Sequence, residues 1–489
     1  MKILIVSPYR TVAPHFENEL ELAQLHLDEG DQVSFLSCLG ELSNCEFNPD
    51  KDPATCQECR LRRRHGLSLL DGRFQQSDFA GAARRRTTDL PTELPNDCFV
   101  DVRSLNATVV GNFEVGSATM SSLISNTRDP ETDVSQYVPL AKRFSKSGLQ
   151  VYNAVLQQIR QQRPDRVYVF NGRFVAMRAV LRACRQAGVD CYMHERGCDT
   201  NHYQLFKNEL LHMLEVYQAR VRDHWTQAAR TPERESSGRD WYDSRVQRVE
   251  KTWHSFVKHQ QPGRLPEGWD VEKHNIVIFT SSEDECAALG DGWADRLYPN
   301  QGEAIERLAR RLATRRPDAV LTVRIHPNQT GVDNPRSRRV LHLNEPNVRI
   351  IAPDATVDSY QLMRVADTVV TFGSTIGMEA VFWGKPSVLL APSFYNQLRG
   401  PLQATDHEHA VELLAQDLMP AADHEALIYG YWCNTNGIPF KYFESNGLFS
   451  GTFKGEVVYA KEPSSFPRRI RKHLRSIKKR IYPGNRRAA

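Results

Sequence analysis

The segment Ala366–Pro392, ADTVVTFGSTIGMEAVFWGKPSVLLAP, restricts the fold more than any other part of the sequence. The β-branched run Thr368–Phe372 leads into the small-residue turn Gly373–Gly377, which is followed by a helix-like apolar stretch and a second apolar run. This order predicts strand, turn, helix and strand, the repeating unit of a parallel sheet. Such a turn presents backbone N–H groups and hydroxyls at a helix N-terminus, where a phosphate is stabilised.

The same alternation of strands and helices occurs on both sides of the Pro- and Gly-containing segment Gln260–Asn275. Each half of the chain is therefore predicted to form a doubly wound, Rossmann-like α/β domain, with the two domains facing one another across a cleft. The predicted strands are Lys2–Ser7, Gln32–Ser37, Arg166–Phe170, Asp190–His194, Ile276–Thr280, Ala319–His326, Val348–Ala352 and Thr368–Phe372. The predicted helices include Phe16–Glu29, Lys142–Gln162, Phe174–Ala187, Gly302–Arg315 and Ser359–Val365.

We expect three regions along the chain. Residues 1–265 form the first domain, with an irregular, Cys-containing insertion at about 38–145 and long helices from Leu205 to His259; residues 266–460 form the second domain; and residues 461–489 form a basic tail. The start has only a short apolar run, and no eighteen consecutive residues are apolar, so neither a signal peptide nor a membrane span is expected. Ten cysteines in 489 residues do not make a disulfide scaffold, which favours a reducing cytosol.

Chemically unusual residues stand at three strand ends of the second predicted domain. Ligands of open α/β sheets bind beyond these carboxyl ends, so we expect an anionic nucleotide there, with an acidic side chain on its ribose hydroxyls. Taken singly, a Ser or Thr before a helix is often only an N-cap, and a His before Pro is often a hydrogen-bonded surface residue. Their occurrence together favours a site. The residues are Ser281, Ser282, Arg324, His326, Gly373, Ser374, Thr375 and Glu379.

RIHPN, followed some forty residues later by ADTVVTFGSTIGMEAVFWGKPSV, resembles the HP and Ser/Thr motifs of GT-B glycosyltransferases. The capsule and surface-polysaccharide enzymes are the most similar: Kdo transferases, bacterial sialyl- and polysialyltransferases, and CDP-glycerol-type polymerases. The resemblance is good over roughly Asn275–Pro392. It implies that His326, Ser374 and Thr375 hold the phosphate of a nucleotide-sugar donor, which in several of these families is CMP- or CDP-linked. Metal-independent transfer, with no cofactor required for catalysis, is the expected chemistry, because the segment Asp50–Asp52 is not placed as a metal site would be.

The first domain lacks the acidic-Gly motif in which these families place a catalytic Asp or Glu. The nearest substitute is YMHERGCD, where Glu195 would deprotonate an acceptor hydroxyl and His194 is the alternative base. Asn171, Arg173 and Arg196 follow the same two predicted strands, and their donors suit an anionic acceptor or a donor carboxylate. A buried Glu–Arg pair that only fixes the strand is the competing interpretation.

The sequence therefore predicts transfer of a sugar from a nucleotide donor to a surface polysaccharide or a lipid-linked glycan. A sugar-nucleotide epimerase of similar two-domain build is one alternative, and a non-catalytic module that binds nucleotide or polyanion is another. Nucleic acid is not an expected partner, because the basic residues occur in the tail and in short Arg runs without interleaved aromatic residues.

A loop in the first domain concentrates four of the cysteines, Cys38, Cys45, Cys56 and Cys59. Four thiolates suit tetrahedral zinc and would stabilise an insertion with little core of its own, so a structural zinc is one interpretation and four free thiols the other. Asp50 and Asp52, on either side of Lys51, resemble the Asp-x-Asp metal site of the other major glycosyltransferase fold. They do not follow a strand, which argues against that role.

The tail is strongly basic. Ten of the 63 Lys and Arg residues lie between Pro467 and Ala489, where there is no Asp or Glu, so the rest of the chain carries a net charge of −6 against +4 for the whole. Its large apolar residues recur at helical spacing, at Phe466, Ile470, Leu474, Ile477 and Ile481. This pattern predicts an amphipathic helix that lies on an anionic membrane surface, here the inner face of the cytoplasmic membrane. A solvated tail, or a helix packed on the first domain, is the alternative.

The tail prediction can be tested by co-sedimentation with anionic lipid vesicles. Each basic residue near such a surface contributes about 1 kcal/mol, so the full-length protein should sediment with the vesicles at low salt and be released at high salt. A protein that ends at Ser465 should stay in solution at both salt concentrations. Equal sedimentation of the two proteins, or of neither, would exclude the tail as the anchor.

Overall fold

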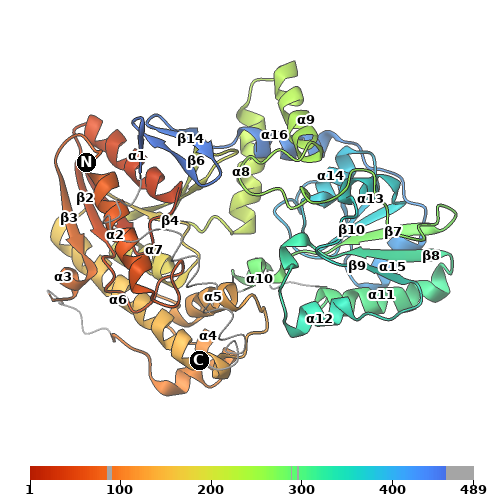
Figure 1. The fold of residues 1–489 in the computed structure, drawn as a ribbon, viewed down its shortest axis with the longest axis horizontal. Coiled ribbons are helices and arrows are strands. Elements are labelled where there is room, and N and C mark those ends of the chain that lie inside the picture. The colour runs from red at the N-terminus through yellow and green to blue at the C-terminus, as the bar shows by residue number, and fades with distance from the viewer. Residues whose placement is uncertain (85–90, 288, 294–296, 459–489) are drawn as a thin grey trace, which may run out of the picture.

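The structure, a computed structural model, describes residues 1–84, 91–287, 289–293 and 297–458. Two mainly parallel sheets form two Rossmann-like domains that lie side by side along the long axis (Figure 1). This confirms the predicted α/β fold class. None of the helices in the described part of the chain is long and apolar enough to cross a membrane.

The first sheet has the strand order β13-β6-β5-β4-β1-β2-β3. Alternate residues of β1 enter two different cores: Leu4 and Val6 pack with α6 and α7, whereas Ile3 and Ile5 pack with α1. A strand buried on both faces reads as a continuous apolar run, which is why β1 was recognisable in the sequence. The bounds are β1 (Lys2–Ser7), β2 (Gln32–Ser37), β3 (Phe74–Asp78), β4 (Arg166–Phe170), β5 (Asp190–Arg196), β6 (His202–Lys207), α1 (His15–Asp28), α6 (Val138–Gln162) and α7 (Val175–Ala187).

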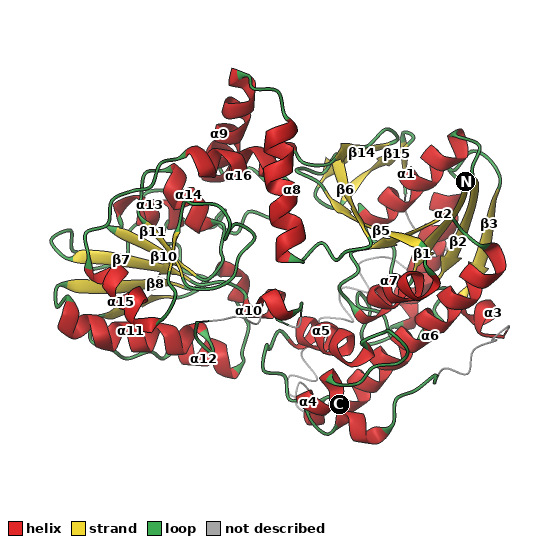
Figure 2. Ribbon diagram, turned by 180° about the vertical axis from the view of Figure 1, so that it is seen from behind, coloured by secondary structure: helices red, strands yellow, loops and turns green. Residues whose placement is uncertain are grey.

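The second sheet has the order β12-β11-β10-β7-β8-β9, and helices cover both of its faces (Figure 2). The chain adds β8 and β9 on one side of β7 and then β10 to β12 on the other, so the order reverses between β7 and β10. Ligands of open α/β sheets bind at such a reversal. The bounds are β7 (His274–Phe279), β8 (Ala319–Arg324), β9 (Val348–Ile351), β10 (Thr368–Thr371), β11 (Ser387–Leu389), β12 (Leu402–Gln403), α11 (Gln301–Arg315), α12 (Pro335–Leu341), α13 (Ser359–Val365), α14 (Ile376–Phe382) and α15 (His407–Ala415).

The predicted insertion at 38–145 is more regular than expected in its described part. It supplies the edge strand β3 of the first sheet, and it packs on α6 through fully buried residues such as Leu123 of α5 and Phe113, which precedes α5. The many charged residues of this stretch hid these short apolar segments in the sequence. The helices are α2 (Pro53–Leu67), α3 (Phe79–Arg84), α4 (Val102–Asn106) and α5 (Val115–Thr127).

The long helices predicted over Leu205–His259 also need correction. The strand β6 extends to Lys207, the helices are limited to α8 (Leu214–Gln227) and α9 (Pro232–Val246), and residues 247–273 contain neither helix nor strand. β6 is a short strand between β5 and the two-residue strand β13, and a helical reading of this charged stretch overlooked it.

The end of the described chain returns to the first domain. After α16 (His424–Thr435), which packs on α9, the strand β13 (Ile438–Pro439) pairs antiparallel with β6. The small sheet of β14 (Phe443–Gly447), β15 (Ser450–Phe453) and β16 (Glu456–Val457) lies beside α1 (Figure 1), where the carboxylate of Glu21 accepts three backbone N–H groups. The predicted second domain, 266–460, included this segment, whereas the strand pairing places it with the first sheet.

The contact between α9 and α16 depends on two glycines. A Cβ on Gly430 would lie 2.3 Å from the carbonyl oxygen of Gly238 and 2.6 Å from the ring of Tyr242. We therefore expect Gly430→Ala to lower the free energy of unfolding by about 1–3 kcal/mol, measured by urea denaturation. Ser236→Ala, on the exposed side of α9, is the matched control and should change it by less than about 0.5 kcal/mol. Equal stability of the two variants would contradict the close contact.

Candidate active site

A pocket opens at the carboxyl ends of β7, β8 and β10, beside the reversal of strand order. It has an empty volume of about 670 Å³, open solvent at its mouth included. The predicted residues His326, Ser374 and Thr375 line it together with Arg245 and Phe256, which the sequence did not single out. The fold thus brings the HP and Ser/Thr motifs to one pocket.

The ring of His326 is poised to donate a hydrogen bond without carrying a charge. Its Nδ1 accepts the backbone N–H of Asn328 at 3.1 Å, and Phe256 packs edge-on against it with ring centroids 5.1 Å apart. Burial lowers the pKa of His326 to about 4, with further lowering by Arg245, Arg324 and Arg128. The imidazole is therefore neutral at pH 7 and carries its proton on Nε2.

The turn after β10 needs glycine at its first position. Gly373 has φ +95°, and a Cβ there would lie 2.7 Å from the carbonyl oxygen of Pro392. The phenol of Tyr395 donates to the carbonyl of Ser374, and the N–H of Gly377 also donates to this carbonyl at 3.1 Å. These contacts fix where the hydroxyls of the turn point.

Glu379 is a buried carboxylate that holds three side chains of the pocket wall in place. Its carboxylate is 1% exposed and accepts hydrogen bonds from Thr375 Oγ1 at 2.9 Å, Tyr360 Oη at 2.9 Å and Arg245 Nη2 at 3.3 Å. The same carboxylate raises the pKa of Arg245. Glu379 thus positions Thr375 and Arg245, while its predicted contact with ribose hydroxyls stays a prediction.

Arg324 is buried and holds a neighbouring loop. Its guanidinium donates to the carbonyls of Ala352 and Ala355 and to Ser359 Oγ, and burial lowers its pKa to about 10. Its side chain also lines the pocket, so its positive charge lies at the pocket wall even though three of its N–H groups are used within the protein. Direct phosphate contact by Arg324 stays a prediction.

Ser281 and Ser282 join strand ends instead of lining this pocket. Ser281 Oγ donates to the carbonyl of Phe372 at 3.0 Å and accepts from Gln301 Nε2 at 3.0 Å. Ser282 Oγ accepts from Asn328 Nδ2 at 3.2 Å. Their predicted place at the strand end is correct, and their hydroxyls tie β7, β10 and the segment after β8 together.

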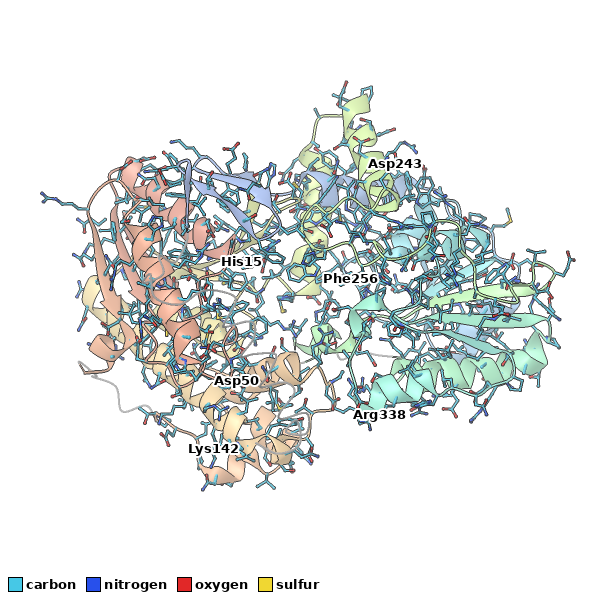
Figure 3. The ribbon with its side chains drawn as sticks, in the orientation of Figure 1. His15, Asp50, Lys142, Asp243, Phe256 and Arg338 are labelled. Carbon is cyan, nitrogen blue, oxygen red and sulfur yellow. The ribbon has the colours of Figure 1, made fainter. Side chains whose placement is uncertain are left out.

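Across from this pocket, Glu195 lies at the end of β5 in the first domain. Its Oε2 accepts Asn171 Nδ2 at 2.8 Å, and its Oε1 is 3.8 Å from Nδ1 of His15, another residue that the sequence did not single out. Burial, with Arg196 and His194, lowers the pKa of His15 well below 6.5, so this ring is neutral. Figure 3 shows His15 on the side of the first domain that faces the second. A carboxylate that is 20% exposed at this edge can accept a proton from a hydroxyl.

His194, the alternative base, is completely buried. Neither ring nitrogen has a hydrogen-bond partner, and the nearest carboxylate oxygen, Oε1 of Glu19, is 3.9 Å away. His194 lies on the face of β5 that packs beside Glu19 of α1, whereas Glu195, near the end of the strand, stays partly exposed. The structure thus places Glu195, and not His194, where an acceptor can reach.

Arg173 takes part in the contact between the domains. Its Nη2 donates to the carbonyl of Asp284 at 3.1 Å, in α10 (Glu283–Cys286), and its Nε to Ser121 Oγ at 3.3 Å. Arg128 pairs with the Asp284 carboxylate at 2.6 Å. Near Arg173, burial raises the pKa of Glu46 to about 7, a titratable group that the sequence did not reveal. The predicted acceptor-binding role of Arg173 stays a prediction.

The segment after α9 connects the two halves of the site. Arg196, at the end of β5, donates a hydrogen bond from Nη1 to the carbonyl of Thr252 in this segment. Four residues after Thr252, Phe256 packs on His326. Phe256 lies across from His15 in Figure 3. One irregular segment therefore runs from the side of Glu195 to the pocket around His326.

Residues 293–412 match the family model of capsule polysaccharide biosynthesis proteins. This segment includes His326 and the turn Gly373–Thr375, so the predicted resemblance is confirmed there. No curated protein matches the chain.

Solved structures are similar at low identity. KpsC from Thermosulfurimonas dismutans, a β-Kdo 2,4-transferase, is 13% identical, with a TM-score of 0.37 over 55% of this chain and 79% of that one. The Neisseria meningitidis UDP-GlcNAc 2-epimerase bound to UDP-GlcNAc is 11% identical, with a TM-score of 0.30 over 88% and 97%. The calicheamicin glycosyltransferase CalG4 is 13% identical, with a TM-score of 0.28 over 88% and 93%.

Three of the four cysteines of the predicted zinc site accept hydrogen bonds through their sulfur atoms. Gly40 N donates to Cys38 Sγ, Asn48 Nδ2 to Cys56 Sγ, and Thr11 N to Cys59 Sγ. Burial raises the pKa of Cys38 to about 11 and that of Cys45 to about 12, which favours the neutral thiol. Among the described residues, the sets of three or more metal-ligand atoms within 4.8 Å of one another are Cys198–Asp199–His202 and His26–Glu29–Asp31.

The zinc site stays a prediction and has a direct test. If the four thiolates hold zinc, the purified protein should contain about one equivalent, visible as added mass in native mass spectrometry. Cys59→Ser should then lose the metal, whereas Cys98→Ser, outside the loop, should keep it. A metal-free mass, with all four thiols open to alkylation, would rule zinc out.

Proposed function

We propose that the protein is a glycosyltransferase that moves a sugar from a nucleotide-sugar donor to a glycan acceptor. The observation that carries the proposal is the pocket at the strand-order reversal, where the neutral His326, the cationic Arg245 and the turn Gly373–Thr375 meet. Opposite this pocket stands the carboxylate of Glu195. The match of residues 293–412 to capsule polysaccharide biosynthesis proteins supports this choice of chemistry.

The proposed reaction is an inverting displacement at the anomeric carbon of the donor sugar. The acceptor hydroxyl gives its proton to Glu195 while its oxygen forms the new glycosidic bond. The bond between the anomeric carbon and the donor phosphate breaks, and the nucleotide leaves with the electron pair. His326 Nε2–H and the hydroxyls of Ser374 and Thr375 donate to the leaving phosphate, and the positive charge of Arg245 stabilises the negative charge that develops there.

The donor is proposed to be CMP- or CDP-linked and to react without a metal, with its phosphate charge met by protein donors. The acceptor is proposed to be a surface polysaccharide or a lipid-linked glycan. The basic tail, 461–489, would hold the enzyme on the inner face of the cytoplasmic membrane, where a lipid-linked acceptor lies. The tail lies outside the described residues. Domain closure would exclude water, which otherwise competes as acceptor.

Nucleotide release, measured with a panel of CMP-, CDP-, UDP- and GDP-sugars, tests the proposal. Removing a hydrogen-bond donor to the developing charge typically costs about 10²–10³ in rate, so His326→Ala should nearly abolish release while the melting temperature is unchanged. Ser374→Ala should have a milder effect, because backbone N–H groups share the contact. His342→Ala, an exposed histidine of the same domain, is the control and should behave as the unaltered protein.

The same assay separates the alternatives. A transferase releases nucleotide faster when acceptor is present and joins the sugar to it, whereas an epimerase produces a modified free sugar without any acceptor. Near-normal turnover by His326→Ala would remove this residue from the mechanism. Failure of the protein to turn over or bind any nucleotide sugar would overturn the proposed function.

A further inference from the structure

Three parts of the chain meet at one cationic, aromatic surface next to Glu195. The guanidinium of Arg196, at the end of β5, lies over the ring of Trp253 at 5.6 Å and over the ring of Phe449 at 4.8 Å. Trp253 comes from the irregular segment after α9, and Phe449 from the turn between β14 and β15. The two rings meet edge to face, with centroids 5.3 Å apart. The ring centroids of His254 and Phe449 are 5.4 Å apart. We call Arg196, Trp253, His254 and Phe449 the aromatic platform.

Large parts of these rings face solvent. Trp253 is 51% exposed and Phe449 is 45% exposed. Two large apolar side chains therefore lie together on the surface, although burial in a core would stabilise each of them more. Nε and Nη2 of Arg196 are buried yet have no hydrogen-bond partner in the protein. Buried polar groups normally have partners, and a buried donor without one needs an explanation. A ligand that offers both an apolar face and an anionic oxygen would supply what the platform lacks.

The platform borders both halves of the proposed active site. Arg196 directly follows Glu195, the proposed base. Trp253 precedes Phe256 by three residues, so their Cα atoms are at most roughly 11 Å apart, and the ring of Phe256 contacts His326 in the donor pocket. A molecule on the platform therefore lies within a few sugar residues of the site where the new bond would form.

We propose that the aromatic platform binds the acceptor as an acidic saccharide. One face of a pyranose ring is a layer of C–H groups with partial positive charge, which packs on the negative face of an aromatic ring. A sugar stacked on Trp253 and Phe449 places its carboxylate beside the guanidinium of Arg196, whose positive charge attracts it. This inference rests on the proposed function and names the acceptor class of the same site.

The surroundings favour a saccharide over a protein or a membrane. The exposed rings surround a guanidinium, so the apolar area is small and interrupted by charge. A protein interface or a bilayer surface requires a wider apolar area with several anchors. A sugar ring needs only one or two stacked aromatic side chains and polar groups at the rim.

Isothermal titration calorimetry with two soluble probes tests the proposal. The acidic probe is tetragalacturonate, and the neutral probe of equal length is maltotetraose. The unaltered protein should bind the acidic probe more tightly. Trp253→Ala and Phe449→Ala should each weaken its binding by about tenfold, whereas Trp253→Phe should retain most of it. Arg196→Gln should remove the preference for the acidic over the neutral probe.

Tyr137→Ala removes an exposed aromatic side chain elsewhere in the first domain and is the matched control. It should leave the affinity for both probes unchanged. CMP and UDP binding, titrated in parallel, should be the same in the Trp253 and Phe449 variants as in the unaltered protein, because neither side chain lines the donor pocket. Weaker nucleotide binding or a lower melting temperature in these variants would show that the platform only holds the domains together. That result would overturn the proposal.

Further outcomes are equally decisive. If the unaltered protein binds neither probe, or if both alanine variants bind tetragalacturonate as well as it does, the platform is not a saccharide site. These results are independent of donor chemistry: a protein that binds nucleotide sugars but not the probes keeps the proposed function and loses this inference. A protein that binds the probes at the platform but no nucleotide loses the proposed function instead.

Discussion

The buried carboxylate of Glu379 is the group on which the geometry of the second domain's ligand edge depends. A carboxylate removed from water costs several kcal/mol unless charges and donors surround it. Its partners Thr375, Tyr360 and Arg245 come from the turn before α14, from α13 and from the end of α9. Each of the three elements must be in place before the charge is satisfied, so a single group sets their mutual positions and the direction of the turn hydroxyls.

The pocket combines a charged side chain, Arg245, with a neutral hydrogen-bond donor, His326. The charge of Arg245 is fixed by the pair with Glu379, while His326 is kept neutral by burial and by the surrounding guanidinium groups. A neutral ring costs less to bury than an imidazolium and still donates one N–H. Under the proposed function, an anion would meet donors that are already oriented and have little water to lose, which is the condition for strong electrostatic stabilisation.

The sequence predicted those parts of the fold whose physics is local. Strands buried on both faces, such as β1 and β4, appear as apolar runs with sharp ends, and the polar residues after them pointed to the sheet edge. The partners that make the pocket work could not be predicted in this way. Arg245 is 130 residues from Thr375 and lies in a highly charged helix, and His15 is far along the chain from Glu195. Only the topology brings these pairs together, and buried packing, not pattern, turns His194 inward.

The antiparallel pairing of β13 with β6 has a consequence for how the protein is made. About 230 residues separate the two strands, and synthesis of that length takes roughly 10–50 s. Until Ile438 and Pro439 have left the ribosome, the edge of β6 is open, and an open edge invites pairing with other chains. Because the first domain closes only when the last described strands arrive, the edge of β6 is open to aggregation for nearly half of the chain's synthesis. Chaperones that cover a sheet edge should therefore matter more to this protein than to one whose first domain is contiguous in sequence.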